Sequence, residues 1–229
     1  MIDLERDGEV FVLRMRAGEN KLNRELLDGV NAALDEVERS EGPAALVTTG
    51  EDRFYSTGLD LGWLGTQGGP GINAFLADLH LLLARLLAFP MATVAALNGH
   101  AFAGGAFVAF AHDFRVMRED KGFVCLPEVD LAMGQGLTPG FYAVLDARLP
   151  RASIHEMLLT GHRYGAAEAL EHQLVSATAP EAEVLSRAVD MARGLASKDR
   201  ATFGALKEGL YVAELATLRA PLPELPAGS

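Results

Sequence analysis

Buried-strand patterns alternate with helical patterns along this chain, and that alternation limits its fold more than any other feature. Residues 44–49 and 92–97 are short apolar runs that end in glycine or an Asn-Gly turn, as buried strands do. Apolar residues at helical spacing precede each run, over residues 23–39 and 72–88. Strands that alternate with helices predict right-handed crossover units and an α/β fold.

The rest of the chain extends this pattern. Residues 9–15 predict a first strand, residues 104–111 a helix of small side chains, and residues 114–117 and 123–126 short strands. From Pro139 onward the pattern is mostly helical. It ends in one predicted helix over residues 201–219, whose apolar face includes Phe203, Leu206, Leu210 and Leu218. The tail, residues 220–229, holds three prolines and is expected to be disordered or to lie on a neighbouring subunit.

Length and composition indicate one domain and exclude some partners. The 229 residues, 49% of them hydrophobic, suffice for one sizeable core. We assign residues 1–180 to this core and residues 181–229 to a helical segment and tail of the same domain. A net charge of −11 argues against nucleic acid or an anionic membrane surface as a partner, though not against a phosphorylated small ligand.

Targeting signals and cysteine usage fit a cytoplasmic protein. The first six residues do not form a signal peptide. The most apolar stretch, residues 79–89, contains His80 and Arg85 and is too short to span a bilayer. Cys125 is the one cysteine, so it cannot form an internal disulfide, and its apolar neighbours predict a buried, inert thiol.

Two glycine-rich loops follow predicted strands. The first, residues 54–61, contains Gly58 and Leu59, and the second, residues 98–106, contains Gly104 and Gly105. Ligands of α/β folds bind where strands end and helices begin, and a helix N-terminus there offers unpaired N–H groups. Amides from both loops can therefore hold one oxygen as it gains negative charge. Taken alone, each loop is explained by turn chemistry.

Two carboxylates interrupt a later apolar stretch. Glu128 and Asp130 follow Pro127. A carboxylate that faces an apolar pocket has a raised pKa, which suits a general base near neutral pH. Glu128 could equally be a solvated turn residue or a helix cap. If the segment is extended, Glu128 and Asp130 share a face and raise each other's pKa further; otherwise Asp130 caps a turn, the role that we favour.

The order of these elements resembles the crotonase (enoyl-CoA hydratase/isomerase) superfamily from about residue 46 to residue 175. The resemblance rests on residues 54–60, residues 90–113, Pro127-Glu128, and Leu158-Leu159-Thr160-Gly161 followed by Ala167-Glu168-Ala169. It implies a crotonase-like spiral of ββα units with a C-terminal helical oligomerisation segment. It also implies homotrimers or dimers of trimers, fatty-acid metabolism, and an acyl-CoA substrate in which CoA is part of the substrate rather than a separate cofactor.

The resemblance also assigns roles to individual residues. It implies that the Leu59 and Gly104 amides form an oxyanion hole and that Asp113 is structural. The further residues that it places along the substrate are Thr57, Gly58, Asp60, Gly105 and Phe107. The sequence around Glu128 most resembles that of the Δ3,Δ2-enoyl-CoA isomerases.

One departure bears on the reaction. Hydratases of this superfamily carry two glutamates, and here Phe107 stands at the first position while Glu128 stands at the second. A single glutamate suffices to move a double bond, by removing a C2 proton from a 3-enoyl-CoA and returning it at C4. An apolar Phe107 would help to exclude water. Residues 132–139 form a longer segment than in hydratases, expected to reshape the acyl pocket or to form a mobile loop.

Alternatives to the isomerase remain open at this point. They are another crotonase reaction on an acyl-CoA, namely hydration, dehalogenation or thioester hydrolysis, with Asp130 as nucleophile or base, and a catalytically inactive CoA-binding subunit. The histidines show no metal-binding spacing, and His100, in the second glycine loop, is the one that could touch a ligand. Candidate contacts for CoA phosphates are Lys21, Arg24, Arg53 and, from a neighbouring subunit, Lys207.

Overall fold

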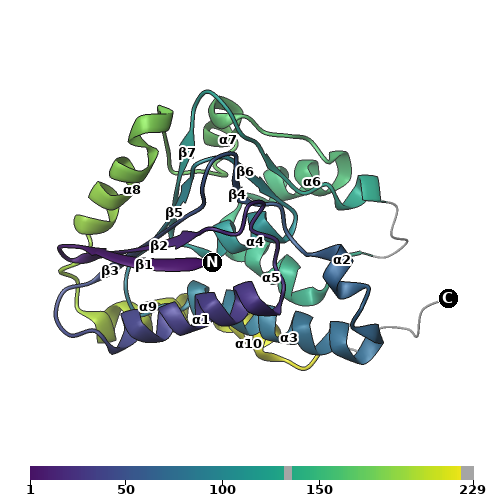
Figure 1. Ribbon diagram of the computed structural model, residues 1–229, viewed down its shortest axis with the longest axis horizontal. Helices are drawn as coiled ribbons and strands as arrows, with labels where there is room; N and C mark the ends of the chain where they lie inside the picture. Colours follow the sequence, from purple (N-terminus) through teal and green to yellow (C-terminus); the bar gives the residue numbers. More distant parts are fainter. Residues whose placement is uncertain (132–135, 223–229) are drawn as a thin grey trace.

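The computed structural model describes residues 1–131 and 136–222. The expectations for residues 132–135 and for the end of the tail, residues 223–229, therefore lie outside the described residues. The described chain forms two sheets surrounded by helices (Figure 1).

The larger sheet has six strands in the order β1-β2-β3-β5-β7-β9. They are β1 (Ile2–Asp7), β2 (Val10–Met15), β3 (Ala45–Thr49), β5 (Thr93–Leu97), β7 (Phe114–Arg118) and β9 (Ala177–Ala179). β1 and β2 form an antiparallel hairpin, and every later pair is parallel. β3 and β5 are buried along their whole length, which explains their continuous apolar runs.

The smaller sheet consists of three short parallel strands, β4 (Phe54–Ser56), β6 (His100–Phe102) and β8 (Val124–Cys125). The chain alternates between the sheets: β3 leads to β4, β5 to β6, and β7 to β8. Helices α2 (Leu61–Leu64) and α3 (Gly68–Leu87) follow β4, and α4 (Gly104–Ala111) follows β6. The expected spiral of ββα units is confirmed, and the carboxyl ends of β4 and β6 carry the two glycine-rich loops.

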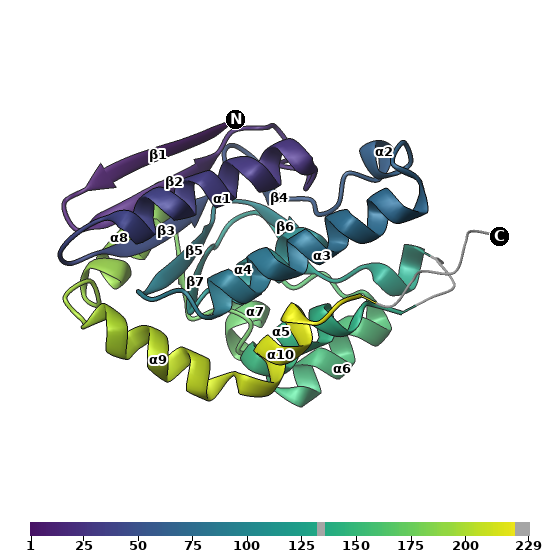
Figure 2. The same ribbon diagram turned by 90° about the horizontal axis from the view of Figure 1, so that it is seen from below.

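Helices cover both faces of the larger sheet. Helix α8 (Val184–Arg193) lies along one face and buries small apolar side chains against β3, β5 and β7 (Figure 1, left). On the other face lie α1 (Arg24–Arg39), α3 and α4 (Figure 2). Asn23 caps α1 by accepting a hydrogen bond from the Leu26 amide, which matches the predicted start of this helix. Helix α4 is buried on all sides, so its eight residues are small or apolar.

Helices fill the region between β8 and the C-terminus. The 3-10 helix η1 (Glu128–Leu131) follows β8, and α5 (Pro139–Arg148), α6 (Arg151–Thr160) and α7 (Ala166–Glu171) follow it. The 3-10 helix η2 (Glu181–Glu183) precedes α8, and α9 (Arg200–Leu210) and α10 (Val212–Arg219) come last. Helix α10 packs against α5 and α3, with Leu215 and Leu218 buried.

The prediction of one final helix over residues 201–219 is wrong. The helix breaks at Tyr211, whose backbone (φ −115°, ψ 32°) is not helical. The Tyr211 hydroxyl accepts a hydrogen bond from Arg148 Nη1 at 2.6 Å, which holds the corner against α5. This turn buries Leu218 but leaves Leu206 and Leu210 exposed, so the four expected residues do not form one buried face.

Further differences concern elements without a strong apolar signal. The predicted first strand is the second, because β1 is a half-exposed edge strand rich in charged residues. β4 and β6, each three residues long, lie within the segments that the sequence suggested were loops. Helix α3 begins at Gly68, four residues before the predicted start.

Helix α3 is long and apolar enough to span a membrane by length and composition. Half of its most apolar window is buried within the fold, and His80 lies in that buried part. Its apolar character is thus accounted for by packing in the core of the domain.

Candidate functional site

Two backbone amides lie close together where β4 and β6 end. Leu22 donates its amide hydrogen to Gly58 O at 2.7 Å and accepts one from Asp60 N at 3.0 Å. This bridge turns the amide of Leu59, between them, away from Leu22. Gly104 is the first residue of α4. Neither the Leu59 nor the Gly104 amide donates a hydrogen bond within the described part of the chain.

The glycines allow these loops to touch. A Cβ atom on Gly58, where φ is +92°, would lie 2.8 Å from Gly104 N, and one on Gly104 would lie 3.4 Å from Leu59 N. A Cβ on Gly105 would overlap Ser56, coming within 2.6 Å of its Cβ atom. Backbone approach at these distances requires glycine. The predicted pairing of the two loops through Gly58, Gly104 and Gly105 is therefore matched by the geometry.

Ala103, directly before Gly104, has a strained backbone. Its φ of 47° and ψ of −124° are unfavourable for a residue with a side chain. The Ala103 amide donates to Cys125 O at 3.0 Å, and its carbonyl accepts from the amides of Ala106 and Phe107. These bonds hold the strained residue on both sides, so the N-terminus of α4 is fixed in direction. Alanine gave no sign of this role in the sequence.

Asn20 supports the first loop and was also not identified from the sequence. It is fully buried, and its side chain accepts from the Ala17 amide and donates to Tyr55 O at 3.0 Å. Its carbonyl accepts a hydrogen bond from Ser56 Oγ at 2.7 Å. A signal existed in the residue type, because its φ of 48° is a conformation that asparagine tolerates better than most residues.

Glu128 lies in η1, three residues after the Cys125 carbonyl that holds Ala103. Its Oε2 atom is buried and has no hydrogen-bond partner among the described residues. Burial raises the pKa of Glu128 above its ordinary value. The carboxylate therefore faces a site where ionisation is disfavoured, and its raised pKa makes it a stronger base than an ordinary glutamate.

A cavity of about 400 Å³ opens beside Glu128, and we call it the Glu128 cavity. Its other lining residues are mostly apolar: Val129, Gly136, Leu137, Tyr142, Arg151, Ile154, His155, Leu158 and Leu159. Glu128 is the one carboxylate among the described residues that line it. Half of the lining residues come from α6.

Phe107 lies one turn into α4 and is buried. Its ring packs on Phe141 of α5 with centroids 4.4 Å apart, and the edge of Phe141 meets His80 at 5.2 Å. His80 is held by Thr138 at 2.8 Å, and burial lowers its pKa to about 4. The position at which hydratases carry a glutamate thus belongs to an apolar aromatic layer, and Phe107 does not line the Glu128 cavity.

Asp130 does not form a face with Glu128. The segment is a 3-10 turn rather than an extended strand, and the Asp130 amide donates to Pro127 O at 2.9 Å. The Asp130 side chain lies over Gly161 at the end of α6. The condition for a carboxylate pair is not met, which agrees with a structural role for Asp130.

Thr57 and Asp60 flank the first loop. The Thr57 amide donates to Glu19 O at 3.0 Å. The Asp60 carboxylate caps α2 by accepting from the Trp63 amide at 3.0 Å, and it also accepts from Asn23 Nδ2 at 3.3 Å. Asp60 thus fixes the loop through contacts within the protein.

Three candidate phosphate-binding residues, Lys21, Arg24 and Arg53, reach the surface. Lys21 pairs with Glu19 and Arg24 with Asp78, each at 2.8 Å on the surface. Arg53 lies over the Phe54 ring at 5.7 Å.

The proposal that Lys207 serves a neighbouring subunit is wrong. Lys207 is buried, pairs with Asp113 at 2.8 Å and donates to the carbonyls of Phe89 and Met91. Burial lowers its pKa to about 8, and the attraction of Asp113 opposes that shift. Asp113 also pairs with Arg148 at 3.1 Å and accepts from Thr93, which confirms its structural role.

The remaining candidates have structural environments. Cys125 is buried, donates to Gly161 O, and has a pKa raised by burial to about 11, as an inert thiol would. His100 lies half-buried between the rings of Phe54, Phe102 and Phe123. Within residues 1–131 and 136–222, no three histidine, cysteine or acidic side chains converge as a metal site would require.

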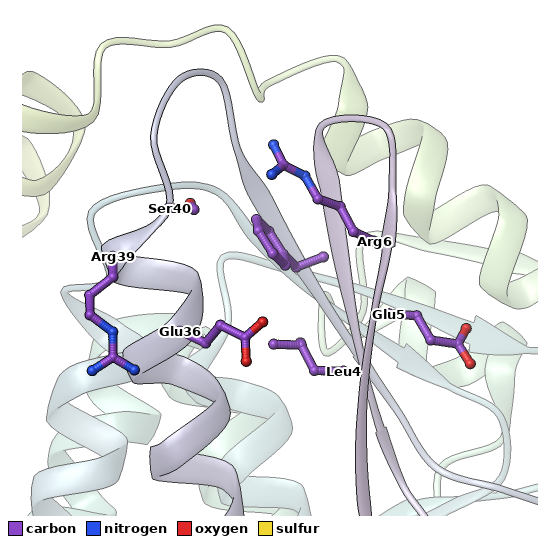
Figure 3. A pocket seen from close by; sticks show the side chains of 7 residues that line it. Leu4, Glu5, Arg6, Glu36, Arg39 and Ser40 are labelled. Atoms are coloured by element: carbon purple, nitrogen blue, oxygen red, sulfur yellow. The ribbon is translucent and has the colours of Figure 1, made fainter.

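A second cavity, of about 340 Å³, lies between β1 and the end of α1 (Figure 3). Leu4, Glu5 and Arg6 line it from β1, and Glu36 and Arg39 line it from α1. None of its lining residues is among the predicted site residues.

Comparisons with known proteins show the family to which the chain belongs. The profile of a family described as "Enoyl-CoA hydratase/isomerase" matches residues 5–220. An "Enoyl-CoA delta isomerase 1, peroxisomal" of Arabidopsis thaliana is 30% identical, over 92% of this chain and 89% of the relative. A "Probable enoyl-CoA hydratase" of Bacillus subtilis is 34% identical, over 84% of this chain and 74% of the relative. The solved structure of a Mycobacterium tuberculosis enoyl-CoA isomerase superposes with a TM-score of 0.87 at 28% identity, covering 96% of this chain and 95% of that one.

Proposed function

The chain belongs to the enoyl-CoA hydratase/isomerase family, and we propose that it converts 3-enoyl-CoA thioesters into the conjugated 2-enoyl-CoA. The observation that carries this proposal is the single carboxylate of the Glu128 cavity. Its Oε2 atom is buried and unpartnered among the described residues, and no second acid stands at the position of Phe107. Similarity to named isomerases supports the same reaction.

In the proposed reaction, the thioester oxygen accepts hydrogen bonds from the Leu59 and Gly104 amides. Glu128 removes a proton from C2, and the electron pair of that C–H bond delocalises over the dienolate. The two amides stabilise the oxygen charge because they are already oriented by the Leu22 bridge and by Ala103. The protonated Glu128 then returns the same proton at C4, so no other reactant or cofactor is consumed.

The surroundings of Glu128 suit both halves of this cycle. A raised pKa makes the carboxylate a stronger base. It also lets the protonated Glu128 keep the proton until it is delivered to C4. The aromatic layer of Phe107, Phe141 and His80 contains no carboxylate, and burial lowers the pKa of His80 to about 4, which makes its imidazole a weak base for activating water. Isomerisation is favoured over hydration for this reason.

Hydration is the second candidate, because a relative named as a probable hydratase is 34% identical. The test is to incubate the purified protein with 3-hexenoyl-CoA and to identify products by mass and ultraviolet absorption. We expect 2-hexenoyl-CoA of unchanged mass from the wild type and a loss of at least about 10³-fold in Glu128→Gln.

Asp130→Asn is the matched control, because it removes a charge two residues away on the same turn. It should retain most of the activity. A product heavier by one water would favour hydration, and thioester binding without any turnover would favour an inactive CoA-binding subunit. Full activity in Glu128→Gln would exclude the proposed base.

A further inference from the structure

We infer that the Glu128 cavity holds the acyl tail of the substrate and selects acyl chains of medium length. The length of helix α6 sets the upper limit. The inference rests on the proposed function, because it takes the tail to run onward from the carbons that Glu128 reaches. It concerns residues to which the reaction itself gives no role.

Helix α6 presents one continuous stripe to the cavity. Its lining residues are Arg151, Ile154, His155, Leu158 and Leu159, at positions i, i+3, i+4, i+7 and i+8. This spacing places all five on one side of the helix. Two more residues line the cavity. Leu137 lies in the segment before α5, and Tyr142 lies in α5.

The two ends of the stripe differ in chemistry. Gly161, at the C-terminal end of α6, lies under Val129 and Asp130 of η1, so Leu158 and Leu159 belong to the end near Glu128. Arg151 begins the helix and pairs with Asp146 of α5 at 2.7 Å. The cavity therefore runs from the catalytic carboxylate, past apolar side chains, to a solvated ion pair.

An apolar occupant is indicated by side chains that now meet water. Leu159 is 62% exposed, Val129 49% and Tyr142 41%, although all three line a cavity. A hydrocarbon chain lying on them would cover this surface, and Glu128 and Arg151 are the only acidic, lysine or arginine side chains among the described residues that line the cavity. Continuity with the buried Glu128 oxygen makes the substrate's own tail the occupant.

The length of the α6 stripe sets the upper limit on the length of the acyl chain. Seven residues separate Leu158 from Arg151, which is about 10 Å along a helix. An extended hydrocarbon covers that span with roughly eight carbons, so acyl groups up to about twelve carbons in total would fit. Carbons beyond the Arg151–Asp146 pair would remain in water and add nothing to binding.

The experiment is an affinity series with saturated acyl-CoA thioesters from four to sixteen carbons, measured by calorimetry. Saturated thioesters cannot isomerise, so the result does not depend on turnover. We expect affinity to rise with each methylene, by up to about fourfold, and to level off near twelve carbons. In Leu158→Trp the indole should fill the near end, and the affinity for decanoyl-CoA should fall at least about tenfold while that for butanoyl-CoA changes little.

Arg151→Leu should move the levelling-off point to longer chains, and Leu170→Trp, on the exposed face of α7 outside the cavity, should leave the series unchanged. Affinity that is independent of chain length in the wild type, or a series unaffected by Leu158→Trp, would overturn the inference. So would a loss of oligomer mass in Leu158→Trp by light scattering, because the cavity would then be a contact between copies. An enzyme inactive on 3-hexenoyl-CoA that still shows the length series would refute the isomerase but not the tail site.

Discussion

Glu128 carries a carboxylate in surroundings that favour its protonated form. Its raised pKa is caused by burial, and no described residue donates to its Oε2 atom. If Glu128 is the base, kcat/KM should rise with pH as it ionises, with a midpoint above the ordinary glutamate value. Rate measurements on 3-hexenoyl-CoA between pH 4 and pH 8 test this (roughly the window for a raised carboxyl pKa). A midpoint at or below the ordinary value would contradict the assignment.

The same shift predicts an effect on stability. Because the folded-state pKa is raised, the folded protein binds more protons than the unfolded chain between the ordinary pKa and the raised one. The contribution of Glu128 to the unfolding free energy therefore falls as pH rises through that interval. Glu128→Gln should raise Tm at pH 7 and lose that advantage near pH 3, measured by thermal melts at both pH values. Asp130→Asn, at an exposed position, should show no comparable gain.

Gly58 offers a separate test of the two amides. Alanine at this position would place a Cβ atom 2.8 Å from Gly104 N in a backbone of φ +92°. We expect Gly58→Ala to lower kcat for isomerisation by about 10²-fold, because the Gly104 amide must move away from the oxygen that it stabilises. Gly165→Ala is the control, since a Cβ there meets nothing within 4 Å. Equal kcat values in the two variants would separate the amides from catalysis.

Residue type determined which parts of the site were predictable. Gly58 and Gly104 were identified because glycine is typical of unusual backbone conformations. Glu128 was identified because a carboxylate within an apolar run is typical of a functional side chain. Ala103 has an equally unusual backbone, but alanine carries no such signal. Asp130 and Lys207 were ambiguous for another reason: their roles depend on Gly161 and Asp113, which only the folded chain brings near them.

At the scale of elements, the length and amphipathicity of a helix or strand determined whether its bounds could be predicted from the sequence. Helix α1 was predictable to within one residue, since a strong apolar stripe and an Asn23 cap define it. The short strands β4 and β6 were not, because three residues show no period and their partners are distant in sequence. The corner between α9 and α10 depends on the hydrogen bond from Arg148 to Tyr211. These residues are 63 positions apart, so no local sequence pattern predicts the corner.

A buried ion pair helps to attach α9 to the core. Lys207 joins Asp113 and the carbonyls of Phe89 and Met91, and all four groups are shielded from water. Lys207→Met keeps much of the volume but removes the lysine donor from the Phe89 and Met91 carbonyls and one of the two cations that pair with Asp113. We expect the free energy of unfolding to fall by about 2–4 kcal/mol in urea titrations. Lys198→Met, at an exposed position before α9, should change it by less than about 0.5 kcal/mol.

At the scale of the whole molecule, α9 leaves apolar side chains uncovered. While Lys207 points inward, Leu206 and Leu210 are 68% and 70% exposed, and the adjoining Val212 is 65% exposed. Leu206 and Leu210 are four residues apart and share one side of the helix. An exposed apolar stripe of this kind is typical of a subunit contact. We therefore expect this chain to self-associate through α9, in the homotrimer or dimer of trimers that its family resemblance suggested.

Light scattering of Leu206→Glu/Leu210→Glu tests this expectation. Two added carboxylates should reduce the molar mass toward that of a monomer, and Leu170→Glu on α7 should not. Because each copy carries a net charge of −11, subunits repel one another, and raising the salt concentration should stabilise the wild-type oligomer. An unchanged mass in the double variant would mean that another surface joins the subunits. A monomeric wild type at all salt concentrations would leave the exposed α9 stripe without a subunit partner and contradict the prediction directly.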